Sequence, residues 1–229
     1  MSPAGALQRT RSKPCGETLR CPGGALCLDF CNTGQGARDA HGSEWLAGFA
    51  DLLDWLEAEG ALGADQAKRI REAARAAPER ARALWSRALE LREALRRVFE
   101  ARVRGEAPPR EALARLEAEH ALGAAFARLA WRHGQGRWEL DASVGAPDAL
   151  LQPIVQSALE LLTAESLARV RRCGNPTCLW LFIDATRNRS RRWCEMASCG
   201  NVFKVRRHRE RARKGSASRR RALRAARKA

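Results

Sequence analysis

Four cysteines in the last quarter of the sequence form two pairs with equal spacing. Four residues separate Cys173 from Cys178, four separate Cys194 from Cys199, and 15 residues lie between the two pairs. Paired thiolates on two tight turns are typical ligands of a tetrahedral zinc ion, and a short spacer allows the turns to face each other. Four thiolates fill the coordination shell and leave no position for a reactive water. The sequence therefore predicts one structural Zn²⁺ rather than a catalytic metal.

The positive charge of the chain is concentrated around and after these cysteines. The 229 residues carry a formal net charge of +16, and residues 169–229 alone contribute +17 while residues 1–168 are nearly neutral. Such a segment favours a polyanionic partner, and we expect double-stranded DNA. The candidate contacts are the cations between and after the cysteine pairs: Arg187, Arg189, Arg191, Arg192, Lys204, Arg206, Arg207, Arg209 and Arg213.

Two other interpretations of the same residues stay open. An RNA-binding or ribosome-associated protein would use the same charges, and a zinc-stabilised module that binds other proteins would use the same cysteines. An enzyme is not expected, because the sequence contains no HExxH, GxxxxGK, GxGxxG or GxSxG motif and its histidines are scattered.

No segment approaches the roughly 18 consecutive apolar residues of a membrane span, and the first residues lack an apolar signal-peptide core. We therefore expect a cytoplasmic, nucleoid-associated protein without a membrane partner. In a reducing compartment, clustered cysteines bind metal more often than they form disulfides.

The other cysteines and the tryptophans are expected to be structural. Cys15, Cys21, Cys27 and Cys31 have irregular spacing, so core packing or free thiols are expected there rather than a second metal site. Core positions are also expected for Trp45, Trp55, Trp85, Trp131 and Trp138. Trp180 and Trp193 are expected to form a small core between the cysteine pairs, with stacking on a base as the alternative.

Hydrophobic periodicity predicts the elements that position the cysteine region. Residues 25–32 alternate between apolar and small or polar side chains, which favours a short strand. Helices are predicted where apolar residues recur at three- and four-residue steps, at 44–59 with Ser43 as its N-cap, 64–77, 79–104, 110–122 and 148–172. A β-hairpin is predicted from residues 128–133 and 137–141 around Gly134 and Gly136.

Within the cysteine region, residues 179–184 are predicted to form a strand that pairs with residues 191–194. Asn201 is predicted to cap a basic helix from Val202 to Gly215. Gly174 and Gly200 follow the first and last cysteines, where we expect backbone N–H groups to point at the thiolates.

The sequence resembles a known family combination. The finger resembles the CGNR zinc finger, and the N-terminal part is similar to the ABATE domain, described as a stress-induced transcription regulator. The matching segments are CGNPTC at 173–178, WCEMASCGN at 193–201, LCLDFCNT at 26–33, ADLLDWL at 50–56 and LREALRRVF at 91–99. The resemblance implies a bacterial cytoplasmic protein with a mixed α/β N-terminal domain, a four-cysteine zinc site and a role in transcription. The sequence departs from the CGNR pattern at position 202, where it has Val202 in place of the arginine that gives the pattern its last letter.

These observations predict an α+β protein. It would comprise a flexible leader at residues 1–23, a mostly helical domain at 24–168 with a short strand and a β-hairpin, a zinc finger with a basic C-terminal helix at 169–215, and a basic tail at 216–229. The expected function is a zinc-finger DNA-binding regulator of transcription. The helical domain would sense a small molecule or bind a protein partner.

Overall fold

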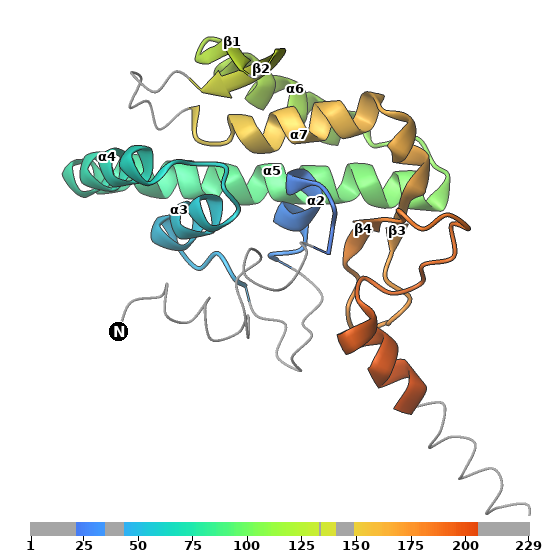
Figure 1. The fold of residues 1–229 in the computed structure, drawn as a ribbon. Coiled ribbons are helices and arrows are strands. Elements are labelled where there is room, and N and C mark those ends of the chain that lie inside the picture. Colours follow the sequence, from blue (N-terminus) through green and yellow to red (C-terminus); the bar gives the residue numbers. More distant parts are fainter. Residues whose placement is uncertain (1–21, 35–43, 133, 141–148, 206–229) are drawn as a thin grey trace, which may run out of the picture.

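One long helix organises the molecule. The computed structural model describes residues 22–34, 44–132, 134–140 and 149–205 (Figure 1). Helix α5 (Pro78–Arg104) runs through the centre and packs against α6 (Arg110–Ala124), which in turn packs on α7 (Gln152–Thr163), and the short helix α2 (Leu26–Cys31) packs against both α5 and α7. Pro78 occupies the first turn, where its missing N–H costs nothing, and Gly105 ends the helix with a φ of +74°.

Two further helices extend this arrangement. Helices α3 (Phe49–Ala58) and α4 (Ala64–Ala76) pack against each other and against α5. The expected helices at 64–77, 79–104 and 110–122 are thus present with small changes at their ends. No helix in the described part of the chain is long and apolar enough to cross a membrane.

The expected strand at residues 25–32 is wrong, because this segment forms α2. Five of its six residues are buried, Cys27, Leu28, Asp29, Phe30 and Cys31, and in a helix these point to different sides. When every side of a short segment is buried, alternation in the sequence no longer distinguishes a strand from a helix. The segment is anchored by the Asp29 carboxylate, which accepts a hydrogen bond from the Gly23 N–H at 3.0 Å.

Helix α3 begins five residues later than expected, because residues 44–48 make other contacts. The Trp45 N–H donates to the Thr33 carbonyl at 3.2 Å, and the Glu44 carboxylate accepts from the Leu46 N–H at 2.8 Å. Ser43, the expected cap, lies outside the described residues. Trp45 thus leaves the helical face and becomes available to pack elsewhere.

The expected hairpin is present as β1 (Ala127–Arg132) paired antiparallel with β2 (Gln135–Leu140). Its tryptophan does not occupy a core, since Trp131 is 76 % exposed, whereas Trp55 is buried as expected. The side chain of Trp138 lies outside the described part.

The predicted helix at 148–172 ends early and changes into other elements. Helix α7 stops at Thr163, residues 165–169 form a 3₁₀ turn, and strand β3 (Val170–Arg172) pairs antiparallel with β4 (Leu181–Ile183). Val170 and Leu181 belong to the same buried core as α2, α3, α5 and α7. The β3–β4 pair therefore joins the cysteine region to the helical part through a shared hydrophobic core, and the whole is an α+β protein.

Candidate metal centre

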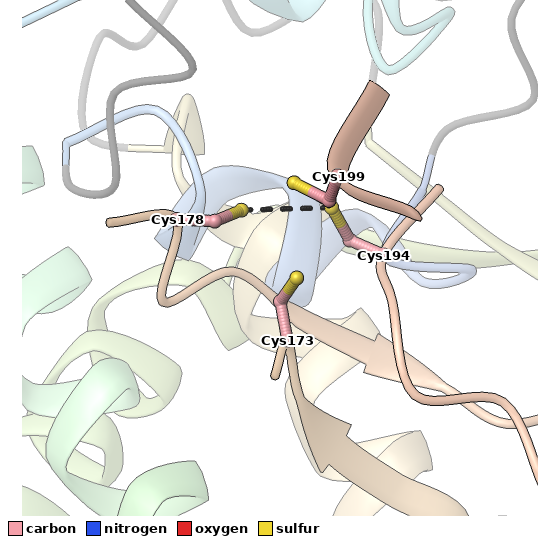
Figure 2. Close-up of side chains that lie close together, drawn as sticks. All are labelled: Cys173, Cys178, Cys194 and Cys199. Atoms are coloured by element: carbon pink, nitrogen blue, oxygen red, sulfur yellow. Dashed lines mark hydrogen bonds between the residues drawn. The ribbon is translucent and has the colours of Figure 1, made fainter. Parts of the chain in front are cut away.

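The four cysteines of the two pairs converge at one point. Their Sγ atoms all lie within 4.8 Å of one another, and the four side chains are buried. Figure 2 shows the sulfur atoms turned toward a common centre, with Cys173 at the end of a strand and Cys199 on a helix. The Sγ of Cys194 lies 3.5 Å from that of Cys178 and 3.7 Å from that of Cys199.

The first pair sits on the connection between β3 and β4. The Cys173 N–H donates to the Trp180 carbonyl at 2.8 Å, and the Cys178 N–H donates to the Asn175 carbonyl at 2.9 Å, which closes a tight turn. Leu179 has a φ of +58°, and this reverses the chain directly after Cys178. The expected pairing of residues 179–184 with 191–194 is wrong, since β4 pairs with β3 instead.

In the second pair, Cys194 lies in a bend, and Cys199 lies on the helical turn that follows, residues 196–200, which continues as helix through residue 205. Asn201 is not the cap of this helix, because it lies inside it and its side-chain amide donates to the Ala197 carbonyl at 3.0 Å. The helix thus begins before Val202, and its first turn carries Cys199 to the sulfur cluster.

The two glycines beside the cysteines do not act as expected. The Gly174 N–H donates to the Arg192 carbonyl at 2.8 Å and the Gly200 N–H to the Glu195 carbonyl at 3.1 Å, so neither points at a thiolate. At Gly174 a side chain would fit only tightly, because an added Cβ would lie 3.1 Å from the Trp193 ring and 3.2 Å from the Arg192 carbonyl oxygen. The group that does reach a sulfur is the Asn175 amide, 3.5 Å from the Cys199 Sγ.

The proximity of four thiols changes their acidity. Hydrogen bonds from Cys178 and Cys194 lower the pKa of Cys173 to about 7. Contacts with the other three thiols likewise hold the pKa of Cys199 well below its ordinary value. The same contacts raise the pKa of Cys178 and of Cys194, with Cys173 the largest cause for both. Four sulfurs this close cannot all ionise without a cation between them.

This donor set fits a zinc ion. A tetrahedral ZnS₄ centre with bonds of about 2.3 Å places its sulfurs about 3.8 Å apart, close to the separations found here. The centre has four thiolate ligands and the Asn175 amide as an outer hydrogen-bond donor, which is typical of structural zinc sites. The cysteines thus provide for one structural Zn²⁺, as the spacing predicted.

A small aromatic core surrounds the cysteines. Trp180, Phe182 and Trp193 are buried with the four cysteines. The Trp193 ring also packs on Phe203, with centroids 4.6 Å apart. The expectation that both tryptophans form this core is confirmed, and neither is placed to stack on a base.

Arg191, one of the expected nucleic-acid contacts, makes its contacts within the protein. Its guanidinium lies 4.5 Å over the Phe182 ring and donates to the backbone carbonyls of Trp193, Ile183, Pro22 and Cys194. Its donors are therefore directed at the protein, and it cross-links the finger to the N-terminal segment. A sequence window cannot distinguish such an arginine from its exposed neighbours.

Asp184 fixes the loop that leads to Arg191. Its carboxylate is fully buried and accepts hydrogen bonds from the Thr186 N–H and hydroxyl and from the Arg191 N–H at 2.6–3.0 Å. Burial opposes ionisation, but these hydrogen bonds outweigh it and hold the pKa of Asp184 below its ordinary value. The carboxylate is thus ionised at neutral pH and determines the path of the spacer between the cysteine pairs.

A polar contact from Asn32, the residue directly after α2, joins the finger to the helical part. The Asn32 side chain donates to the Leu181 carbonyl at 2.9 Å and accepts from the Leu181 N–H at 2.8 Å. It thus satisfies the outer edge of β4 as a neighbouring strand would. Trp45 adds an edge-to-face contact with Trp180, with ring centroids 5.5 Å apart. Sequence reasoning missed Asn32, because its partner is 149 residues away.

We expect Asn32→Ala to lower the free energy of unfolding by about 2–4 kcal/mol, because it leaves two buried backbone groups of Leu181 without partners. Urea unfolding of the zinc-loaded protein measures this. Asn201→Ala is the matched control, since Asn201 is exposed and its loss should cost under about 1 kcal/mol. Equal losses in the two variants would contradict the role of Asn32.

The cations of the finger differ from those of the helical part. Arg187, Arg189, Arg192 and Lys204 are exposed, and none of them forms an ion pair with another described residue. Arginines of the helical part are commonly paired with acids, as Arg87 is with the buried Glu119 at 3.1 Å. The other expected contacts, Arg206, Arg207, Arg209 and Arg213, lie outside the described residues.

The described N-terminal cysteines belong to the core. Cys27 and Cys31 are buried in α2, and burial raises the pKa of Cys27 to about 12, so both thiols are neutral and poor metal ligands. Among the described residues, Cys173, Cys178, Cys194 and Cys199 alone form a group that could hold a metal ion. Cys15 and Cys21 lie outside the described part.

Comparison with protein families agrees with this arrangement. Residues 24–165 match the ABATE family, described as a "putative stress-induced transcription regulator", and residues 169–212 match the CGNR zinc finger. No curated protein matches the chain. The ABATE match covers more than half of the chain, and the four clustered cysteines lie within the second match. The chain therefore belongs to the ABATE family and carries a CGNR zinc finger after the ABATE region.

Proposed function

We propose that this protein is a regulator of transcription that binds double-stranded DNA through its zinc finger and the basic residues that follow it. The observation that carries the proposal is the set of exposed cations between and after the two cysteine pairs, which form no ion pair within the described part of the chain. Unpaired surface cations attract the DNA backbone, whereas those in ion pairs are already neutralised. The two family matches support a regulatory rather than a catalytic role.

In this proposal the zinc finger, the basic residues and the ABATE region have different roles. The zinc ion would hold the β3–β4 turn and the helix of residues 201–205 in one orientation, and Arg187, Arg189, Arg192 and Lys204 would reach phosphates on either side of that helix. Arg206, Arg207, Arg209 and Arg213 would extend the contact. The ABATE region, which we take as residues 24–168, would receive a signal and sit near DNA in the cytoplasm.

The test is binding of a fluorescein-labelled duplex of 30 base pairs, measured by anisotropy over a series of salt concentrations. If roughly five to eight phosphates are contacted, we expect log affinity to fall with log salt at a slope of about −4 to −7. Arg192→Ala should flatten the slope by about one. Arg110→Ala is the matched control, because Arg110 is exposed but paired with Glu117 on α6, and it should leave the slope unchanged.

Two outcomes would contradict the proposal. Affinity that does not change with salt would exclude a phosphate-dominated contact. Structured RNA of the same length that displaces the duplex completely at equal concentration would favour the RNA-binding alternative, which uses the same cations.

A further inference from the structure

The finger helix exposes apolar side chains where a purely phosphate-binding surface would be polar. Val202 and Val205 are 50 % and 49 % exposed, and both lie on the helical residues 201–205. Phe203 is accounted for by its contact with Trp193. Met196 lies against the Gly200 backbone, since a Cβ added at Gly200 would be 2.7 Å from its sulfur. Neither Val202 nor Val205 belongs to a hydrophobic cluster of the described residues, and residues three apart share one face of a helix.

The surroundings of this pair are cationic. Lys204 lies between the two valines in sequence, Arg192 stacks near Trp193 at 5.6 Å, and both are exposed. The only acid in residues 185–205 is Glu195, which is occupied by the Ser198 hydroxyl at 2.8 Å. A second copy of this chain would bring like charges together. The occupant must therefore be a polyanion that also offers apolar groups at its surface.

Duplex DNA meets both requirements in its major groove. Each thymine presents a 5-methyl group there, and the groove is wide enough for an α-helix flanked by cations on the phosphates. Figure 1 shows the orange-red helix after β4 projecting from the finger away from α5, so the helical part does not cover it. Valine is short, and it reaches a methyl group when the helix backbone approaches the base edges closely.

We propose that Val202 and Val205 contact thymine methyl groups in the major groove and give the finger a preference for A·T base pairs. This inference rests on the proposed DNA binding and adds to it the residues that distinguish one sequence from another. The arginines contribute affinity for any duplex, whereas the two valines contribute affinity only where a methyl group is present.

The test compares two labelled 24-base-pair duplexes of alternating adenine and thymine, one of them with every thymine replaced by uracil, which removes only the methyl groups. We expect the full-length zinc-loaded protein to bind the uracil duplex about fourfold more weakly for each methyl contacted, or roughly tenfold or more for two. The variant V202A/V205A should bind both duplexes equally. Leu129→Ala, which shortens an exposed apolar residue on β1, should keep the preference.

The outcomes separate this inference from the proposed function. Salt-dependent binding with equal affinity for both duplexes overturns the inference and leaves DNA binding intact, while absence of binding to either duplex overturns both. A thymine preference that survives in V202A/V205A excludes these residues as its source. The inference also fails if the two substitutions abolish sedimentation with phosphatidylglycerol vesicles or dissociate a dimer in sedimentation equilibrium, since a membrane or a second copy would then cover the valines.

Discussion

The Cys194→Ser variant is expected to purify with no tightly bound zinc, against one zinc per chain in the unaltered protein. Cys194 is fully buried, and its sulfur lies 3.5 Å and 3.7 Å from two others, so a hydroxyl in its place leaves three thiolates around the metal. Structural zinc in small folds contributes on the order of 10 kcal/mol of binding free energy, which is folding free energy in such a site.

The loss should spread beyond the finger. Val170 and Leu181 belong to the main hydrophobic core. The Asn32 side chain, 149 residues before Leu181 in the sequence, donates a hydrogen bond to the Leu181 carbonyl. When the finger unfolds, these contacts with the helical part are lost, and we expect a lower midpoint of thermal unfolding monitored by helical circular dichroism.

Elemental analysis and thermal unfolding measure both effects. Cys31→Ala is the matched control, because Cys31 is equally buried but belongs to α2, and this variant should keep one zinc per chain. Carefully purified wild-type protein with no zinc would disprove the metal site, and loss of metal in the Cys31 variant would show that α2 contributes a ligand.

Truncation after Val205 is expected to reduce affinity for duplex DNA by on the order of 1000-fold while the zinc is retained. The segment removed, residues 206–229, carries 12 of the chain's 42 Lys and Arg with a single acid, Glu210. Loss of four or five phosphate contacts of about 1 kcal/mol each accounts for this change. The cut keeps Phe203, so the packing on Trp193 is preserved.

A second truncation, after Gly215, separates the contribution of residues 206–215 to DNA affinity from that of residues 216–229. It keeps Arg206, Arg207, Arg209 and Arg213, and we expect it to lose much less affinity than the longer truncation if these four contact DNA. Anisotropy titration at fixed salt measures both, with zinc content as the control for folding. A protein ending at Val205 that binds as tightly as the intact chain would exclude this segment from the interface.

Several features of the protein could be predicted from residue types and spacing alone. The zinc ligands follow from two equal cysteine spacings, because chelation by a tight turn is a local property. The helices α4, α5 and α6 follow from apolar residues at helical spacing, and Pro78 and Gly105 mark the ends of α5 because their effect on backbone conformation is also local. The asymmetry of charge, which favours a polyanionic partner, is a property of composition.

Burial on every side of a segment and contacts between distant residues were decided by the tertiary structure. Residues 26–31 form a helix although they alternate, because all sides of this segment are buried and the pattern then carries no information about its period. Helix α3 begins only at Phe49 because the residues before it bond to Thr33 and pack on Trp180.

Contacts between distant residues also explain why Arg191 points into the protein while Arg192 is exposed. Both are arginines in one basic stretch, yet Arg191 is directed inward by the carbonyls of Ile183 and Pro22, and Arg192 remains exposed. Asn32 joins the finger to the helical part because an asparagine side chain can pair with both backbone groups of Leu181, and only the folded chain brings those residues together. Local spacing thus determined the metal ligands and the long helices, and long-range packing determined how the finger is attached and which cations face solvent.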